Sequence, residues 1–247
     1  MISIFIFSPI GYAASIRIPN YSSKGTFVQG SCIDDTEENI YVFKQNESNH
    51  GNLQKINLKT KKSKRINLSD AGRAAIHHGN DMCYIKIRKT PYLLIAPGSN
   101  RYYIVIFKLT KSKAVYEGKI RSRYGVSGIT LKDSSNGYIT NSSMMKKIKI
   151  NIQKKKIVSY KTIKGYTCNQ GINLCGDFIT GCKGGFYKHN GRIIKYKFKN
   201  NKLKKIFSKK VDGEPQSCII TASHLYIVIE GKCRYYHYKD KIFITKT

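Results

Sequence analysis

The residues whose types could do chemistry are most concentrated at positions 77–82, which read His-His-Gly-Asn-Asp-Met. Imidazoles beside a carboxylate are the side chains that metal sites and acid–base catalysis use. On a strand, however, neighbouring residues point to opposite faces, so at most one of His77 and His78 would reach a given site. We therefore expect no metal ion, no cofactor and no catalytic residue in this stretch.

This stretch is one of five related phrases, each of which contains a glycine or a serine and opens an apolar segment. The glycine of each phrase, or the serine that replaces it in the fifth, falls at positions 30, 79, 128, 171 and 217. A repeat period of about 40–50 residues is typical of propeller blades. Each repeat continues with short apolar or alternating runs separated by turn residues, for example the hairpin signal Asn136-Gly137. Helical structure is expected only as a short turn at residues 69–75.

The sequence therefore predicts an all-β fold. We expect a five-bladed β-propeller with four-stranded antiparallel blades, as a single domain over residues 15–247. The blades are expected at about residues 27–68, 77–120, 125–163, 166–209 and 211–247. Within the last blade the expected strands are residues 217–221, 225–230, 234–238 and 241–245. An N-terminal strand at residues 15–18 is expected to pair with this blade and close the ring.

The phrases would place their polar side chains on the innermost strands, near one mouth of a central channel. Amides and carboxylates in this mixture suit hydroxyl-rich ligands, or a hydrated cation held by carbonyl oxygens. An equally supported alternative is that these side chains satisfy backbone groups where the inner strands crowd together. The predicted ligand-binding residues at the channel mouth are Gln29, His78, Asn80, Asp81, Gln170, Glu214 and Gln216.

The charge balance is strongly positive, with 45 Lys and Arg against 14 Asp and Glu and a net charge of +31. Such a surface attracts polyanions. Basic turns recur between the expected third and fourth strands, at residues 59–65, 108–113, 146–156, 195–205 and 239–241, which predicts a cationic rim. The alternatives are a bias of the coding sequence towards Lys, and the ordinary placement of Lys at hairpin tips.

We expect a monomeric domain, and the polyanions that its charge could attract are nucleic acid, teichoic-acid-like wall polymers and anionic lipid headgroups. A nucleic acid is disfavoured because no nucleic-acid-binding motif is present. Peripheral contact with an anionic membrane surface is compatible with the charge. The seven cysteines include no C-x-x-C pair, so we expect buried free thiols rather than a zinc or redox site.

Residues 1–14 are apolar and end in a small-x-small pattern, Gly11-Tyr12-Ala13. They resemble the hydrophobic region and cleavage site of a secretory signal, although the basic region that normally precedes it is missing. We interpret them as a signal-peptide remnant, which predicts a secreted, extracellular protein.

Several of the phrases resemble those of helveticin J-like class III bacteriocins, across about residues 27–232. The resemblance is strongest at residues 78–82 and is weakest in the third repeat, which has only Ser127-Gly128. It implies a protein secreted by Gram-positive bacteria that kills related bacteria at the cell surface, without supplying the molecular mechanism. The expected function is thus a secreted antibacterial protein that binds an anionic wall or surface glycopolymer. The alternative is a propeller-type lyase or hydrolase acting on such a polymer.

Overall fold

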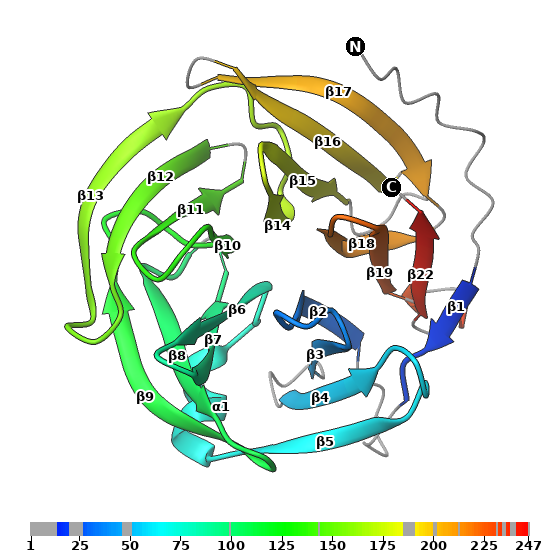
Figure 1. Cartoon of the computed structure of the whole chain (residues 1–247), viewed down its shortest axis with the longest axis horizontal. Coiled ribbons are helices and arrows are strands. Elements are labelled where there is room, and N and C mark those ends of the chain that lie inside the picture. Colours follow the sequence, from blue (N-terminus) through cyan, green and yellow to red (C-terminus); the bar gives the residue numbers. More distant parts are fainter. Residues whose placement is uncertain are drawn as a thin grey trace.

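The computed structural model of the chain is nearly all-β (Figure 1). It describes residues 14–19, 27–45, 51–98, 100–142, 144–184, 191–199, 202–211, 213–230, 232–233, 236–237 and 241–246. Over these ranges the one helix is α1 (Asp70–Ile76), which confirms the short helical turn. No helix in the described ranges is long and apolar enough to cross a membrane. The signal-like residues 1–13 lie outside the described residues.

Four groups of four consecutive antiparallel strands make up most of the chain. Group 1 contains β2 (Phe27–Ile33), β3 (Asn39–Gln45), β4 (Gly51–Asn57) and β5 (Ser63–Leu68). Group 2 contains β6 (Asp81–Ile87), β7 (Thr90–Ala96), β8 (Tyr103–Leu109) and β9 (Lys113–Arg121). Group 3 contains β10 (Gly128–Leu131), β11 (Asn136–Asn141), β12 (Met144–Asn151) and β13 (Lys156–Ile163). Group 4 contains β14 (Gln170–Cys175), β15 (Phe178–Lys183), β16 (Gly191–Lys199) and β17 (Lys202–Val211).

Group 5 is built from both ends of the chain. Its strands are β18 (Glu214–Ile220), β19 (His224–Glu230), β22 (Lys241–Lys246) and β1 (Ala14–Arg17). The predicted pairing of an N-terminal strand with the last group is confirmed. The expected strand at residues 234–238 is wrong for this sheet, because β22 is its third strand and β1 its fourth. Among the described strands, the short β20 (Lys232–Cys233) and β21 (Tyr236–His237) form a separate two-stranded sheet.

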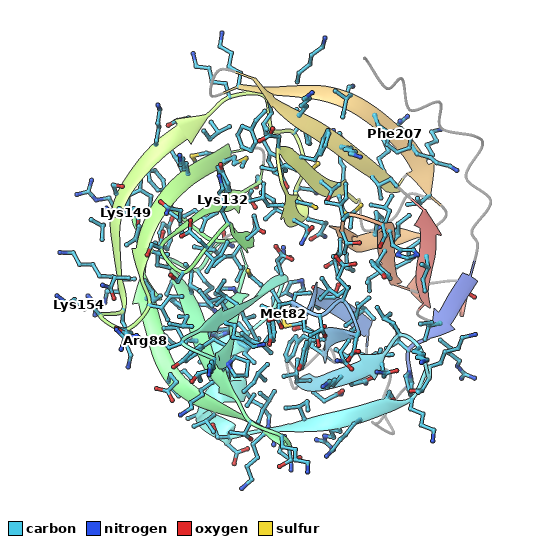
Figure 2. The ribbon with its side chains drawn as sticks, in the orientation of Figure 1. Met82, Arg88, Lys132, Lys149, Lys154 and Phe207 are labelled. Atoms are coloured by element: carbon cyan, nitrogen blue, oxygen red, sulfur yellow. The ribbon has the colours of Figure 1, made fainter. Side chains whose placement is uncertain are left out.

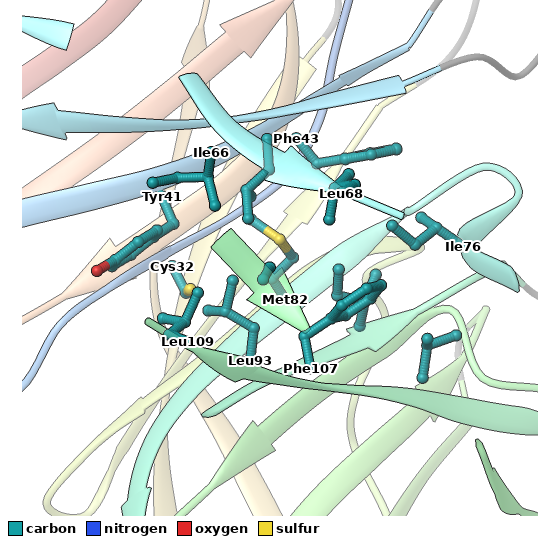
Figure 3. Packing of buried hydrophobic residues seen from close by; sticks show 14 of the residues in the cluster. Cys32, Tyr41, Phe43, Ile66, Leu68, Ile76, Met82, Leu93, Phe107 and Leu109 are labelled. Atoms are coloured by element: carbon teal, nitrogen blue, oxygen red, sulfur yellow. The ribbon is translucent and has the colours of Figure 1, made fainter. Parts of the chain in front are cut away.

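Apolar side chains cover both faces of the second strands, because each group packs against neighbours on two sides. In β7, Leu93 and Ile95 belong to one buried cluster, whereas Leu94 and Ala96 belong to another. Figure 3 shows the first of these clusters, in which Met82 packs among side chains from groups 1 and 2. Cysteines fill such positions too: Cys32, Cys83, Cys168, Cys182 and Cys218 are buried free thiols as predicted, whereas Cys175, which was also expected to be buried, is only half-buried.

The groups lie side by side around a common centre, with their first strands innermost (Figure 1). Each first strand contacts the next, in the order β2, β6, β10, β14 and β18, and β18 contacts β2. The fourth strands lie on the outside and follow one another end to end. We call β5, β9, β13 and β17 the outer belt.

Brief parallel contacts link consecutive strands of the outer belt. They pair Asn67 with Lys113, Arg121 with Lys156, and Lys164 with Lys202. The first two of these contacts join groups 1, 2 and 3 into one 12-stranded mixed sheet, where the sequence predicted separate four-stranded sheets. The cause is the twist that accumulates from strand to strand, which turns the outermost strands until their ends meet.

Strand β1 should stabilise the whole fold although it has only four residues. Ile16 is 2% exposed and packs with Val28 of group 1 and Val228 of group 5. We expect Ile16→Ala to lower the free energy of unfolding by about 2–5 kcal/mol, the usual cost of such a buried truncation. Urea unfolding measures the change, with Ser15→Ala, at an exposed position of the same strand, as the control. Equal stabilities of the two variants would contradict this role.

Candidate functional site

Asp81 lies at the centre of the fold and is 1% exposed. It begins β6 of group 2, and its carboxylate Oδ2 accepts hydrogen bonds from the backbone nitrogens of Ile129 in group 3 and Ile172 in group 4, each at 3.0 Å. Burial raises the pKa of Asp81 to about 8, although hydrogen bonds from the Ile172, Ile129 and Met82 amides act in the opposite direction. One side chain therefore joins three groups.

The glycines of the repeated phrases allow the first strands to touch backbone to backbone. The Gly30 nitrogen donates to the Gly79 oxygen at 2.8 Å, and a Cβ on Gly30 would lie 2.8 Å from the Asp81 backbone. A Cβ on Gly171 would lie 2.7 Å from the Gln216 oxygen. Side chains at these positions would force neighbouring groups apart, so the phrase recurs because the centre is crowded.

A serine performs this joining role between groups 5 and 1. Ser217 replaces the glycine of the phrase, and its Oγ accepts a hydrogen bond from the Ser31 nitrogen at 3.1 Å. Similarly, Asn80 Nδ2 donates to the Ser127 oxygen at 2.6 Å and links group 2 to group 3. Most of these polar side chains thus form hydrogen bonds with backbone groups of the neighbouring group.

The predicted glutamines are buried or half-buried. Gln29 and Gln216 are 1% and 2% exposed. Gln170 is half-buried, and its Nε2 donates to Glu214 Oε1 at 3.1 Å, between groups 4 and 5. Burial raises the pKa of Glu214, and the Gln170 hydrogen bond lowers it. The carboxamide oxygens of Gln29 and Gln170 have no hydrogen-bond partner among the residues described. The predicted site therefore divides into an enclosed polar centre and a separate pocket.

We call this second feature the end pocket. It has a volume of about 400 Å³ and lies where α1 leads into β6, beside the turn between β7 and β8. None of its lining residues is acidic. Of the predicted residues, His78 and Asn80 line it, and the full lining consists of His77, His78, Asn80, Pro97, Gly98, Asn100 and Arg101.

Both histidines line the end pocket, against the expectation that at most one could reach a site. That expectation assumed a strand, whereas residues 77–80 form a turn that ends α1 and has φ 52° at His77 and φ 59° at Gly79. Buried Gln45 holds this turn: when its amide is oriented to satisfy all of its hydrogen-bond partners, the nitrogen donates to the His77 and His78 carbonyl oxygens at 2.9 and 2.7 Å. The Gln45 oxygen accepts from His78 Nδ1 at 2.7 Å, which fixes the His78 tautomer.

The rest of the lining of the end pocket comes from residues 97–98 and 100–101. The Gly98 nitrogen donates to the Val126 oxygen at 3.0 Å, and the Val126 nitrogen donates to the Arg101 oxygen at 2.9 Å. Arg101 Nη2 lies 3.4 Å from His77 Nδ1. Desolvation, and then the charges of Arg101 and Lys119, lower the pKa of His77. The end pocket therefore has a positive potential.

The sequence reasoning missed His77, Asn100 and Arg101 as pocket residues. A usable signal existed, because antiparallel pairing of β6 with β7 sets Asp81 opposite Ala96. The residues that precede β6 and those that follow β7 must then lie close together. The turn signal at residues 97–100 could have been combined with the phrase at residues 77–80 on that basis.

The outer belt carries a second candidate surface, which is cationic. Its only acidic residue is Glu117. Neither of the ion pairs Lys86–Asp35 (2.7 Å) and Arg73–Asp70 (3.7 Å) involves these strands. Its exposed cations are Lys64, Arg65, Lys113, Lys119, Arg121, Lys156, Lys161, Lys202, Lys204, Lys205 and Lys210.

The distribution of charge differs from the predicted rim of turns. Cations line the strands of the outer belt as well as the turns, and Figure 2 shows Lys149, Lys154 and Arg88 at the periphery while Met82 lies near the centre. Group 5 has no turn between its third and fourth strands, because β1 comes from the other end of the chain. Of the fifth expected basic turn, at residues 239–241, residues 239–240 lie outside the described residues.

No family model and no curated protein matches the chain. Its fold is similar to solved structures of propeller type. A glutaminyl cyclase from Myxococcus xanthus gives a TM-score of 0.56 at 8% identity, over 97% of this chain and 100% of that chain. The xyloglucan PUL GH43B of Bacteroides ovatus gives 0.59 at 10% identity, over 94% and 54%. A luciferin-regenerating enzyme gives 0.55 at 9% identity, over 94% and 95%. At such identities the similarity shows the fold alone.

Asp81→Asn should remove a pH dependence of stability. Burial raises the pKa of Asp81 from 3.8 to about 8, so the folded state binds one proton more than the unfolded state between these values. The stability that protonated Asp81 contributes is fully present below about pH 4 and is lost as the pH rises to about 8. Urea unfolding of both proteins across this range measures the effect. A constant difference between wild type and variant would contradict it.

Proposed function

We propose that this protein binds an anionic polymer at a bacterial cell surface and acts there as a secreted antibacterial protein. The framework of the proposal is a closed five-bladed β-propeller with four-stranded antiparallel blades, in which groups 1–5 are the blades. Three observations support it: the antiparallel pairing within each group, the unbroken order of contacts among the first strands, and the pairing of β1 with β22. The similarity to propeller-type structures agrees with this framework.

The crowding of cations on the outer belt is the observation that carries polymer binding. Like charges lie directly opposite each other at Lys147 and Lys161, at Arg192 and Lys210, and at Lys197 and Lys204. Such pairs destabilise a sheet. A bound polyanion would neutralise them and release its own counterions.

The spacing on the outer belt favours an extended ligand over a small one. Exposed residues at alternate strand positions, such as Lys119 and Arg121, lie about 7 Å apart. Because the strands of the belt continue end to end, these cations recur along the periphery rather than gathering in one cavity. A polymer with regularly repeated negative charges fits this arrangement, and its binding would depend on charge more than on detailed shape.

The antibacterial part of the proposal derives from the resemblance to helveticin J-like bacteriocins. The residues that carry it, at positions 78–82, combine Asp81 at the centre with His78 and Asn80 at the end pocket. The same contacts between neighbouring groups in both proteins would explain part of the resemblance. Shared action at the cell surface would explain the cationic periphery as well.

An enzyme acting on a surface polymer is the alternative, and the paired histidines of the end pocket are the observation that favours it. Burial lowers the pKa of His78, so at neutral pH it is an uncharged base. The nearest carboxylate in sequence, Asp81, is turned towards Ile129 and Ile172 instead. Release of reducing ends or monomers from purified wall polymer, abolished in His78→Ala while binding persists, would establish the alternative.

Binding to isolated Gram-positive walls should weaken steeply with salt and should depend on the outer belt. Replacing Lys156, Lys161, Lys204 and Lys205 with Gln should lower affinity at low salt by up to about 1,000-fold, given about 1 kcal/mol per cation near an anionic surface. The control replaces exposed Lys59, Arg88, Lys89 and Lys132 in the turns, with the same change in net charge. Sedimentation of walls with bound protein measures both. Equal losses would contradict the belt as the contact surface.

Purified protein should inhibit growth of bacteria whose walls it binds, and the outer-belt variant should inhibit less. Growth curves across a panel of Gram-positive strains measure this. Wall binding without inhibition of any strain would leave polymer binding standing and would overturn the antibacterial part.

A further inference from the structure

We propose that the end pocket is a binding site for one oxyanion, a phosphate or carboxylate group, on a ligand that also bears hydroxyl groups. This goes beyond polymer binding by the outer belt, because it concerns a different part of the molecule and a single group rather than a chain of charges. A volume of about 400 Å³ falls within the range of small-molecule sites, about 300–1,000 Å³.

The charges around the end pocket select an anion. Arg101 is exposed at the edge of the pocket, and its Nη2 lies 3.4 Å from His77 Nδ1. The positive charge of Lys119 also lowers the pKa of His77. The acidic residues nearby in sequence are directed elsewhere: Asp81 accepts from backbone nitrogens of groups 3 and 4, and Asp70 pairs with Arg73 on α1. Arginine can bind phosphate or carboxylate through two parallel hydrogen bonds.

The remaining polar groups of the pocket suit hydroxyls. Nδ1 of His78 is held by the Gln45 oxygen, so the neutral ring offers Nε2 as an acceptor. Nδ2 of Asn80 is held by the Ser127 oxygen, which leaves its carboxamide oxygen as an acceptor. Acceptors beside a cationic end match a sugar phosphate or a uronic acid better than a bare inorganic ion.

The walls of the end pocket are fixed before any ligand binds. Gln45 holds the peptide groups of His77 and His78, and Val126 holds the turn that carries Arg101. At Gly79, φ is 59°, and a Cβ there would lie 2.3 Å from the Phe43 ring, so the turn is built into the core. A preorganised site loses less entropy on binding than one that must form around its ligand.

Binding should be coupled to protonation of His77. A bound oxyanion would oppose the charges of Arg101 and Lys119 that now lower the pKa of His77, so that pKa should rise on binding. By linkage, affinity should increase as the pH falls through the pKa of His77.

The test is an NMR pH titration of the histidine ring resonances of the full chain with glucose 6-phosphate, glucuronate or uncharged glucose. We expect one or both anions, but not glucose, to raise the pKa of His77, and the comparison of the two anions identifies the preferred group. Arg101→Gln should weaken binding about tenfold or more, whereas Arg123→Gln, at an exposed cation outside the lining, should not. His224, in group 5, is the internal reference.

Absence of any response at His77 to millimolar anion, or an equal response in Arg101→Gln, would overturn the site. The titration repeated on the outer-belt variant separates the two proposals. That variant should lose wall binding and keep the response of His77. If the response disappears along with wall binding, the ligand is held by the outer belt and not by the end pocket.

Discussion

The hydrogen bonds from two backbone amides to the buried carboxylate of Asp81 are the interaction on which the rest of the structure depends. The first strand of every group is an edge strand that faces the centre, and its inner backbone groups cannot pair with a neighbouring strand. Buried and unpaired, each would cost free energy. Asp81 supplies an acceptor to Ile129 and Ile172, and the Gly79 oxygen and the Ser217 hydroxyl serve Gly30 and Ser31. The repeated phrase is therefore a solution to the edges that a radial arrangement creates.

The innermost and the outermost strand of each group both have an edge with unpaired backbone groups, and the two edges are protected in different ways. At the centre the edges are covered by side chains and by close backbone contact. On the outside the edges of the belt are protected by lysines, which discourage pairing with another chain. A few lysines per strand would suffice for that purpose. Like charges set directly opposite each other, as at Lys197 and Lys204, exceed what protection requires, and this excess is what favours an anionic partner.

Much of the fold could be predicted because it follows from local patterns. The alternation of Lys and Ile predicted β12, the apolar run at residues 92–96 predicted β7, and the repeat period predicted the five groups. The strand at residues 241–245 was predicted and corresponds to β22, but its direct pairing with β19 was not, because a tyrosine-rich run at residues 235–238 lies between them and also resembles a strand. The end pocket was hidden for a related reason. Its walls are separated by a hairpin in the sequence, and the positive φ of His77, which turns both imidazoles into it, leaves no periodic signal.

The pairing of β1 with β22 also has a kinetic consequence. Ala14 lies opposite Ile244, so the contact that completes group 5 joins segments that are far apart in the sequence and can form only when both are available. Contacts of such long range are slow to form, because the entropy of closing the loop must be overcome before the contact gives any stability. A nascent chain, or one passing end-first through a narrow channel, would remain open along this seam until the last strand emerged. By this argument we expect the pairing of β1 with β22 to be a late step of folding.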